Sequence, residues 1–266
     1  MTNFKTLDFY LNNAFQNKKI IVTGSSRGLG LKTCEALSSR GASLAMFSRS
    51  LKEMKILKKK LTNPSNHICI KLDLFNNSNI RNAVKRAQKF LKQVDIIIHI
   101  AGGGIGIKNP LMRHEEILKL LQLNLLSAIE INRIILTNKK KNNHLKIIHI
   151  GSITSYEAVG SVGYNTSKAA LLAYVRSLGR ELYDKNVVVT GLMPGGFLAP
   201  GNAMERLKFK NLKAYNKFIR ERLPRNKMGT VEEIMPMLLF LCSDLSSMMG
   251  GCMVPIDAGE GKSYII

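Results

Sequence analysis

Short apolar runs alternate with longer amphipathic stretches along most of the 266-residue chain. The apolar runs predict strands at residues 19–23, 43–47, 67–72, 95–100, 146–150, 187–192 and 253–256. Helical periodicity lies between them, at residues 28–40, 79–92, 118–137, 164–183 and 231–241. Most of the strands lack polar alternation, which is typical of strands covered on both faces. The pattern predicts an α/β fold, a single domain built on a doubly wound parallel sheet of about seven strands with helices on both faces.

Residues 1–15 precede this pattern as an N-terminal extension, and residues 16–266 form the predicted domain. The apolar residues Phe4, Leu7, Leu11, Ala14 and Phe15 share one side of a short predicted helix, which would pack on the body or, alternatively, touch a membrane surface. The chain has no uninterrupted run of 18 apolar residues, and its first residues lack the pattern of a secretory signal. We therefore expect a cytoplasmic protein with no membrane span.

The chain is strongly basic, with 40 Lys and Arg against 18 Asp and Glu and a formal charge of +22. Such a charge attracts polyanions in general. However, the sequence has no zinc-finger spacing, no basic heptad and no Trp, and its excess of Lys comes with abundant Asn and Ile. We expect a solvated basic surface and no specific binding of nucleic acid.

The four cysteines, Cys34, Cys69, Cys242 and Cys252, form no C-x-x-C pair, and none has a His at metal-ligand spacing. We interpret them as buried thiols of a protein in a reducing compartment. The sequence therefore predicts neither a disulfide framework nor a metal site.

A glycine-rich turn, TGSSRGLG at residues 23–30, joins the first predicted strand to the first predicted helix. In this context Gly24 permits a tight turn, Gly28 lets the backbone approach a pyrophosphate, and Gly30 allows the helix to pack closely on the strand. The helix N-terminus supplies N–H groups for phosphate. An ordinary glycine-rich turn is the alternative. The residues expected to contact a dinucleotide are Gly24, Ser26, Arg27, Gly28, Leu29 and Gly30.

The end of the second predicted strand, MFSRS, lacks the carboxylate that binds the ribose 2'-hydroxyl of NAD. Ser48 and Arg49 stand there instead, and Arg27 lies in the glycine turn, so that two guanidinium groups would clamp a 2'-phosphate. NADP(H) is therefore the preferred cofactor, and NAD(H) stays open because either Arg is also explained by the basic composition. Asp73, after the third strand, is a candidate partner of the adenine amino group, or it only caps the next turn.

Tyr164 and Lys168 lie one helical turn apart in YNTSK, and Ser152 follows the strand 146–150 at the edge where parallel sheets bind ligands. These residues suit hydride transfer to a carbonyl without a metal. A nearby ammonium would lower the phenol pKa from about 10 by up to about three units, and Ser152 would hold the carbonyl oxygen. Ser155 and Ser161 are alternatives to Ser152, and an ordinary helix surface is the alternative for the pair.

From residue 18 to about residue 259, the sequence resembles the short-chain dehydrogenase/reductase family. The resemblance is carried by TGSSRGLG, Asp73, HIAGG at 99–103, Asn124 in LQLNLL, Ser152, Tyr164 with Lys168, Pro194-Gly195, and a tail that contains GTVEEI, LCSD and GGCMVPIDAG.

This resemblance implies a Rossmann-like fold and a catalytic tetrad of Asn124, Ser152, Tyr164 and Lys168. Asn124 would position a water that links Lys168 to solvent, and Lys168 would also bind the nicotinamide ribose. Further cofactor contacts are implied for Ala101, Gly102, Pro194 and Gly195. Family members associate through the outer helices, here 118–137 and 164–183, so we expect a homodimer or homotetramer.

Three features depart from the family pattern. The family's N-N-A-G is HIAG here, and we expect a structural rather than a catalytic His99. The loop between Ser152 and Tyr164 is one residue shorter than is common. Ala199 stands where a Thr often contacts the carboxamide, so backbone groups near Phe197 would have to substitute. The altered segment at 99–102 and Ala199 favour, as the alternative function, a cofactor-binding member without turnover.

Residues 197–227 fall where the family places its substrate lid. Nine of the 27 residues from 201 to 227 are Lys or Arg, about twice the share of 40 in 266 for the whole chain. One interpretation is an acidic or carrier-linked carbonyl substrate, such as a 3-oxoacyl thioester or a sugar precursor, and a merely solvated helical lid is the other. The predicted function is an oxidoreductase that transfers a hydride between NADP(H) and a carbonyl or secondary alcohol.

Overall fold

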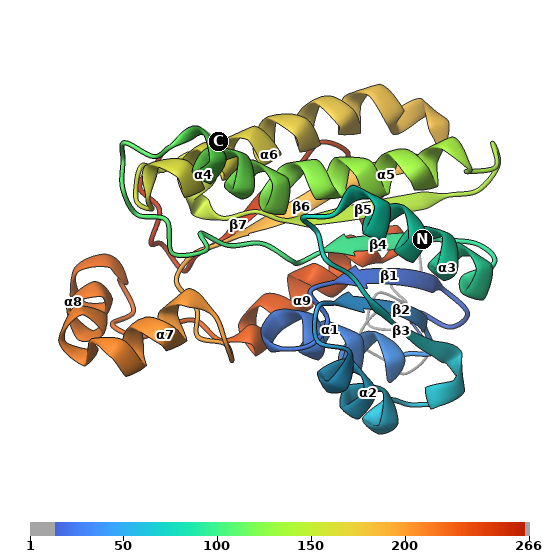
Figure 1. The fold of residues 1–266 in the computed structure, drawn as a ribbon, viewed down its shortest axis with the longest axis horizontal. Coiled ribbons are helices and arrows are strands. Elements are labelled where there is room, and N and C mark those ends of the chain that lie inside the picture. Colours follow the sequence, from blue (N-terminus) through green and yellow to red (C-terminus); the bar gives the residue numbers. More distant parts are fainter. Residues whose placement is uncertain (1–13, 264–266) are drawn as a thin grey trace, which may run out of the picture.

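The computed structural model describes residues 14–263, in which seven parallel strands form one sheet (Figure 1). The strand order is β3-β2-β1-β4-β5-β6-β7, so the chain reverses direction of winding between β1 and β4. The strands are β1 Lys19–Thr23, β2 Ser43–Ser48, β3 His67–Lys71, β4 Ile96–His99, β5 Leu145–Ile150, β6 Val187–Pro194 and β7 Met253–Ile256. The predicted doubly wound parallel sheet is confirmed.

Helices cover both faces of this sheet. One layer contains α3 (Asn77–Leu91), α4 (His114–Leu121), α5 (Ser127–Thr137) and α6 (Val162–Leu182), and the other contains α1 (Gly28–Ser38), α2 (Leu51–Lys60) and α9 (Val231–Cys242) (Figure 1). Two apolar cores result, one on each face. Val22 belongs to one core and its neighbour Ile21 to the other, because successive side chains of a strand point to opposite faces. This double burial explains why the strands lack polar alternation.

The predicted helix 118–137 is longer and less regular in the structure. It begins at His114, where the Glu116 carboxylate accepts a hydrogen bond from the Arg113 N–H at 2.9 Å, and it is interrupted by a π-helical turn at Gln122–Leu126. By length and composition alone, the stretch His114–Thr137 is apolar enough to cross a membrane. In this fold it packs against α3 and α6 as part of a helical layer (Figure 1).

Two further helices, α7 (Ala203–Lys210) and α8 (Leu212–Arg222), stand apart from both layers beyond the carboxyl ends of the strands (Figure 1). They enclose a small apolar cluster of their own, formed by Tyr215, Leu223 and Met228. The connection to the body runs through a bridge between Phe197 and Gly229. We call residues 197–227 the α7–α8 segment.

Most of the predicted N-terminal extension, including Phe4, Leu7 and Leu11, lies outside the described residues. Its last residue, Phe15, is fully buried, and its N–H donates to the carbonyl oxygen of Arg40 at 3.0 Å. The described end of the extension therefore packs on the body next to α1. The four cysteines are free thiols, of which Cys34 and Cys242 are buried and Cys69 and Cys252 are half-buried.

Candidate active site

The glycine turn between β1 and α1 is shaped by two close backbone approaches. Gly24 has a φ of +73°, and a Cβ on it would lie 2.9 Å from the Ala101 nitrogen. A Cβ on Gly30 would overlap the carbonyl oxygen of Gly24. The first turn of α1 has no acidic residue, and no side chain caps its N-terminus. These features fit the pyrophosphate of a dinucleotide, because backbone N–H groups and the positive end of the helix dipole remain available.

The end of β2 lies beside this turn. The Ser48 hydroxyl donates to the Ser26 hydroxyl oxygen at 2.8 Å, which ties the two segments together. Arg49 and Arg27 are both exposed, and a Cβ on Gly201 would lie 2.7 Å from the Arg27 side chain. The glycine turn and the end of β2 therefore carry two guanidinium groups and two hydroxyls, a set of side chains whose chemistry fits a 2'-phosphate.

Asp73 stands after β3 and is exposed. Its carboxylate accepts a hydrogen bond from the Phe75 N–H at 3.0 Å, and its own N–H donates to the Asn79 side chain at 2.7 Å. Asp73 thus caps the turn into α3, as the alternative interpretation expected. A contact with adenine stays a prediction.

The segment from Ala101 to Gly104 forms the wall between the glycine turn and α6. The Thr23 hydroxyl oxygen accepts hydrogen bonds from the backbone N–H groups of Ile100 and Ala101, at 3.1 and 3.3 Å. A Cβ on Gly102 would lie 2.9 Å from Asn124 Oδ1 and 3.3 Å from Lys168 Nζ. The cofactor cradle and the predicted catalytic residues therefore share this wall.

Asn124 lies in the π-helical turn and is 4% exposed. Its Oδ1 accepts from the Gly103 N–H at 2.9 Å, and its Nδ2 donates to the carbonyl oxygens of Gly103 and Leu120 at 3.1 and 2.9 Å. These three hydrogen bonds hold the wall in place. π-Helical turns are often found at functional sites.

Tyr164 and Lys168 occupy the first two turns of α6 and lie on one face. The Lys168 ammonium is 5.9 Å from the centre of the Tyr164 ring and donates to the Ile150 carbonyl oxygen at 2.8 Å. Ser152 follows β5, and its hydroxyl interacts with the Tyr164 phenol. Of the alternatives, Ser155 is buried among other residues and Ser161 precedes α6. The structure brings together the four residues that the resemblance assigned to the tetrad.

Burial controls the ionisation of this group. It raises the pKa of Tyr164, an effect that the Ser152 hydrogen bond partly opposes, and it lowers the pKa of Lys168 to about 8. The expected net fall of the phenol pKa, by up to about three units, is therefore wrong for this structure, in which the pKa of Tyr164 is raised. The ammonium is aimed at the Ile150 carbonyl rather than at the phenol, and the loss of solvent has the larger effect.

Pro194 ends β6, and the N–H of the following Gly195 donates to the Ile256 carbonyl oxygen at 3.0 Å. Ala199 is 3% exposed, and a Cβ on Gly28 would lie 3.5 Å from its side chain. The loop after β6 therefore packs against the glycine turn, and cofactor contacts of Pro194 and Gly195 stay a prediction. Substitution of the missing Thr by backbone groups near Phe197 stays a prediction.

Glu260 was missed by the sequence reasoning. It is 4% exposed, its carboxylate accepts from the Gly196 N–H at 2.5 Å, and it pairs with Arg222 of α8 at 3.2 Å. Burial raises the pKa of Glu260. This one carboxylate joins the C-terminal segment, the loop after β6 and the α7–α8 segment. No local motif marks it, because its partners lie 38 and 64 residues away in the chain.

Comparison of the chain with known proteins identifies the family to which it is similar. Residues 18–209 match the model of the short chain dehydrogenases. The 3-oxoacyl-[acyl-carrier-protein] reductase of Buchnera aphidicola subsp. Baizongia pistaciae is 32% identical over 248 residues, which are 91% of this chain and 97% of the relative.

Two solved structures share the fold, each with a TM-score of 0.85 at 23% identity. They are L-sorbose reductase from Gluconobacter frateurii with NADPH and L-sorbose, over 95% of this chain and 100% of that one, and a 7α-hydroxysteroid dehydrogenase with NADH, over 97% and 98%. The match over residues 18–209 covers more than half of the chain, and it includes the glycine turn, Ser152, Tyr164 and Lys168. The chain thus belongs to the short-chain dehydrogenase/reductase family, oxidoreductases that interconvert carbonyl and alcohol groups with a nicotinamide cofactor.

Proposed function

We propose that this protein is an NADP(H)-dependent reductase in which Tyr164 is the proton donor, Ser152 holds the carbonyl oxygen, and Lys168 and Asn124 complete the site. The observation that carries the proposal is the shared wall from Ala101 to Gly104. It touches the glycine cradle on one side and Asn124, Tyr164 and Lys168 on the other. A substrate carbonyl bound there would lie between the cofactor site and the phenol.

A nicotinamide cofactor held at the glycine turn would supply a hydride to the carbonyl carbon. The Ser152 hydroxyl donates a hydrogen bond to the carbonyl oxygen and fixes it near Tyr164. As negative charge develops on this oxygen, the Tyr164 phenol gives it a proton. The raised pKa of Tyr164 keeps the phenol protonated at neutral pH, which suits the direction of reduction.

Lys168 acts on the phenolate that is left behind. Its ammonium persists below about pH 8, the value to which burial lowers its pKa, and it stabilises the new negative charge in a site with little water. Turnover should therefore decline on the alkaline side as Lys168 loses its proton. Asn124 holds the wall against which Lys168 rests, and by resemblance it places the water that returns a proton from solvent.

Replacement of Tyr164 by Phe tests this assignment. We expect kcat/KM for carbonyl reduction to fall about 10³-fold, because the proton donor is lost, while the Kd for NADPH stays within about threefold of wild type. Tyr183→Phe is the matched control, because Tyr183 lies just beyond the far end of α6 and its hydroxyl donates to the Ser247 carbonyl oxygen at 3.0 Å.

An unchanged rate in Tyr164→Phe would refute the assignment of Tyr164. Wild-type protein that binds NADPH but reduces no carbonyl in a broad panel would instead favour the alternative, a cofactor-binding member without turnover. Ala199 and the HIAG segment are the observations behind that alternative.

A preference for NADP(H) follows from Arg27, Arg49 and the lack of a carboxylate after β2. One of the two solved structures above was solved with NADPH and the other with NADH, so the argument for NADP(H) rests on the residues of this chain.

We expect Arg49→Ala and Arg27→Ala each to raise the Kd for NADPH about tenfold or more and to leave the Kd for NADH within about twofold. Arg86→Ala, an exposed Arg of α3, controls for the lost positive charge. Equal effects on both cofactors would contradict the preference.

The α7–α8 segment is the proposed substrate lid, and its charge favours an acidic partner. Lys217, Arg222 and Arg225 pair with carboxylates, whereas Lys208, Lys210 and Lys213 have no ion pair among residues 14–263. The relative of 32% identity is a reductase of substrates linked to acyl carrier protein. We infer a 3-oxoacyl thioester on an acidic carrier as the substrate, with an anionic sugar precursor as the second candidate.

Substitution of Lys208, Lys210 and Lys213 together by Gln tests the charge of the lid. We expect kcat/KM for a carrier-linked 3-oxoacyl substrate to fall about tenfold at low salt and the difference from wild type to shrink as salt screens the charges. A short neutral 3-oxoacyl thioester should react equally well with both proteins. The triple change of Lys139, Lys140 and Lys141 to Gln, in the loop before β5, is the charge-matched control. If wild type and the variant turn over both substrates equally at every salt concentration, the acidic substrate is rejected and the lid is only a solvated basic surface.

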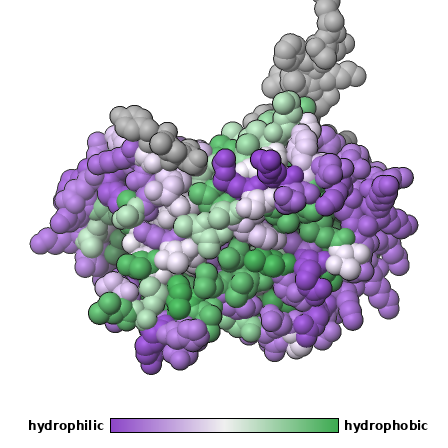
Figure 2. Space-filling view, turned by 90° about the horizontal axis from the view of Figure 1, so that it is seen from above, coloured by the Kyte–Doolittle hydropathy of each residue, from purple (hydrophilic) through white to green (hydrophobic). Residues whose placement is uncertain are grey.

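The outer face of α4, α5 and α6 favours association with a second copy of the chain. Apolar side chains gather on this face (Figure 2), and Leu118, Leu126 and Val162 are 44%, 41% and 50% exposed. Apolar surface that gathers on one face of a soluble protein often marks an interface. We propose a homodimer or homotetramer built through it, as in other members of the family.

Sedimentation velocity tests this assembly. Wild type should sediment as a dimer or tetramer, and the double change of Leu118 and Leu126 to Glu should give monomers, because charges would be buried in the interface. Phe209→Glu is the control, because Phe209 is 80% exposed on α7, away from this face. A monomeric wild type at micromolar concentration would reject the proposed interface.

A further inference from the structure

Two histidines lie side by side in the core, directly beneath the proposed active site. His99 of β4 and His149 of β5 are register partners on neighbouring strands, and their rings stack at a centroid distance of 4.6 Å and an angle of 18°. Both are almost completely buried, and the edge of the Tyr174 ring meets His149 at 5.9 Å. Buried polar groups are almost always hydrogen-bonded, so a partner is expected for each of the four ring nitrogens.

Asn132 of α5 joins the two rings. Its Oδ1 lies 2.8 Å from His99 Nε2, and its Nδ2 lies 3.4 Å from His149 Nε2 and 3.1 Å from the Tyr174 hydroxyl. An amide oxygen only accepts and an amide nitrogen only donates. His99 therefore carries its proton on Nε2, and His149 carries its proton on Nδ1. Exchanging the two amide atoms of Asn132 would reverse both assignments, and the tautomers would still be opposite.

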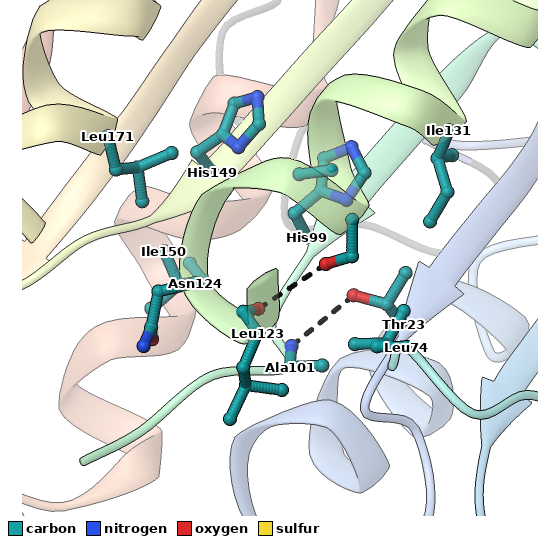
Figure 3. A pocket seen from close by; sticks show the side chains of 12 residues that line it. Thr23, Leu74, His99, Ala101, Leu123, Asn124, Ile131, His149, Ile150 and Leu171 are labelled. Carbon is teal, nitrogen blue, oxygen red and sulfur yellow. Dashed lines mark hydrogen bonds between the residues drawn. The ribbon is translucent and has the colours of Figure 1, made fainter. Parts of the chain in front are cut away.

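Opposite tautomers leave one donor and one acceptor at the two Nδ1 atoms. The Nδ1 of His149 is buried and has no hydrogen-bond partner among residues 14–263. His99 uses Nε2 toward Asn132, so its Nδ1 is left as an acceptor. In Figure 3 both rings stand over a cavity that also meets Thr23 of β1 and Asn124 of the π-helical turn.

This cavity has a volume of about 10 Å³, which is roughly the room that one water molecule needs. Its wall combines polar residues, Thr23 and Ser127, with apolar ones such as Ile131 and Leu171. A water molecule both donates and accepts, so it matches a donor and an acceptor on adjacent rings. A larger organic ligand does not fit this volume.

Charged occupants are excluded by the surroundings. Burial lowers the pKa of His99 to about 4 and the pKa of His149 well below its usual range, so both rings are neutral at physiological pH. The titratable groups that face His149 are His99 on β4 and Lys168 and Tyr174 on α6, while α5 contributes the neutral Asn132. The positive charge of Lys168 disfavours a cation, and no cationic group in the cavity wall would hold an anion.

We propose that His99 and His149 form a binding site for a single water molecule, which bridges their Nδ1 atoms and positions the ends of β4 and β5 beneath Lys168. Ile150, next to His149, accepts the hydrogen bond of the Lys168 ammonium, and Ala101 and Gly102 follow His99 within three residues. The water thus sets the spacing of two backbone segments that contact Lys168. The positioning role rests on the proposed function, whereas the water and the tautomers do not.

The binding site is tested on the full-length protein without turnover. Long-range ¹H–¹⁵N correlation spectra of the imidazole rings should show His99 and His149 as neutral and opposite tautomers at pH 7. A crystal structure at high resolution should show one ordered water within about 3.2 Å of both Nδ1 atoms. Identical tautomers, a protonated ring or a dry cavity would overturn the proposal, even if Tyr164 proves to be the proton donor.

The positioning role is tested by His149→Phe, which keeps an aromatic ring in the stack and removes both nitrogens. We expect the alkaline decline of kcat, set by Lys168, to move to lower pH by about 0.5 unit or more. The change removes the ring nitrogens and the water, and the less polar surroundings disfavour the charged form of Lys168. His149→Gln, which restores a donor and an acceptor, should recover much of the shift. His144→Phe, an exposed position before β5, is the matched control.

Melting temperatures recorded for the same variants separate positioning from mere structural support. A lower melting temperature of His149→Phe with an unmoved alkaline decline would overturn the positioning role. A shift in pH that His149→Gln reverses would support it. If His149→Phe does not fold, the tautomers and the ordered water of the wild type still decide whether the water site exists.

Discussion

The site depends on the close approach of three backbone segments at the carboxyl edge of the sheet. Gly24 lies against Ala101 at the ends of β1 and β4, and Gly30 of α1 lies against the Gly24 carbonyl. Side chains at these positions would force the segments apart. Because they are absent, the N-terminus of α1 opens onto a narrow cradle at the point where the strand order reverses, which is where ligands of such sheets bind.

The same close approach positions the wall from Ala101 to Gly104, which contacts the glycine turn on one side and the proposed catalytic residues on the other. Thr23 accepts hydrogen bonds from Ala101 and from Ile100 just before the wall, and Asn124 holds Gly103 by two more. Lys168 rests against Gly102 and the Ile150 carbonyl. The cofactor cradle and the acid–base residues are thereby positioned by one continuous piece of backbone. Burial then acts on both ionisable groups in the direction of their neutral forms, which favours a protonated phenol and a readily deprotonated Lys.

The sequence predicted those parts of the structure that local patterns encode. All seven strands appear within about two residues of their predicted bounds, and β1 and β7 have the predicted bounds, because strands buried on both faces stand out as apolar runs. The helix α2 was not predicted, because only Met54 and Leu57 of its ten residues are buried and the rest are mainly Lys. The π-helical turn was missed because hydrophobic periodicity does not distinguish one wide turn within an amphipathic helix.

The site residues, too, could be predicted only where a local sequence pattern marks them. Tyr164 and Lys168 were found because helical spacing places them on one face, and Ser152 because it ends a strand. His149 and Glu260 were missed because their roles come from register and long-range packing: His149 stacks on His99 only once β4 and β5 pair, 50 residues apart in the chain. The phenol pKa was misjudged for a related reason, since spacing reveals which groups are near each other but not how little water surrounds them.

The central claim is that a hydride passes from the nicotinamide to a carbonyl carbon beside Tyr164. The most direct measurement uses NADPH that carries deuterium at C4 of its nicotinamide ring. Mass spectrometry then shows whether the deuterium appears in the alcohol formed from a 3-oxoacyl thioester. The account predicts one deuterium on the carbinol carbon for one of the two C4 epimers of the labelled cofactor and none for the other. Alcohol that carries no deuterium from either epimer, or NADPH that is bound and never oxidised, would contradict it.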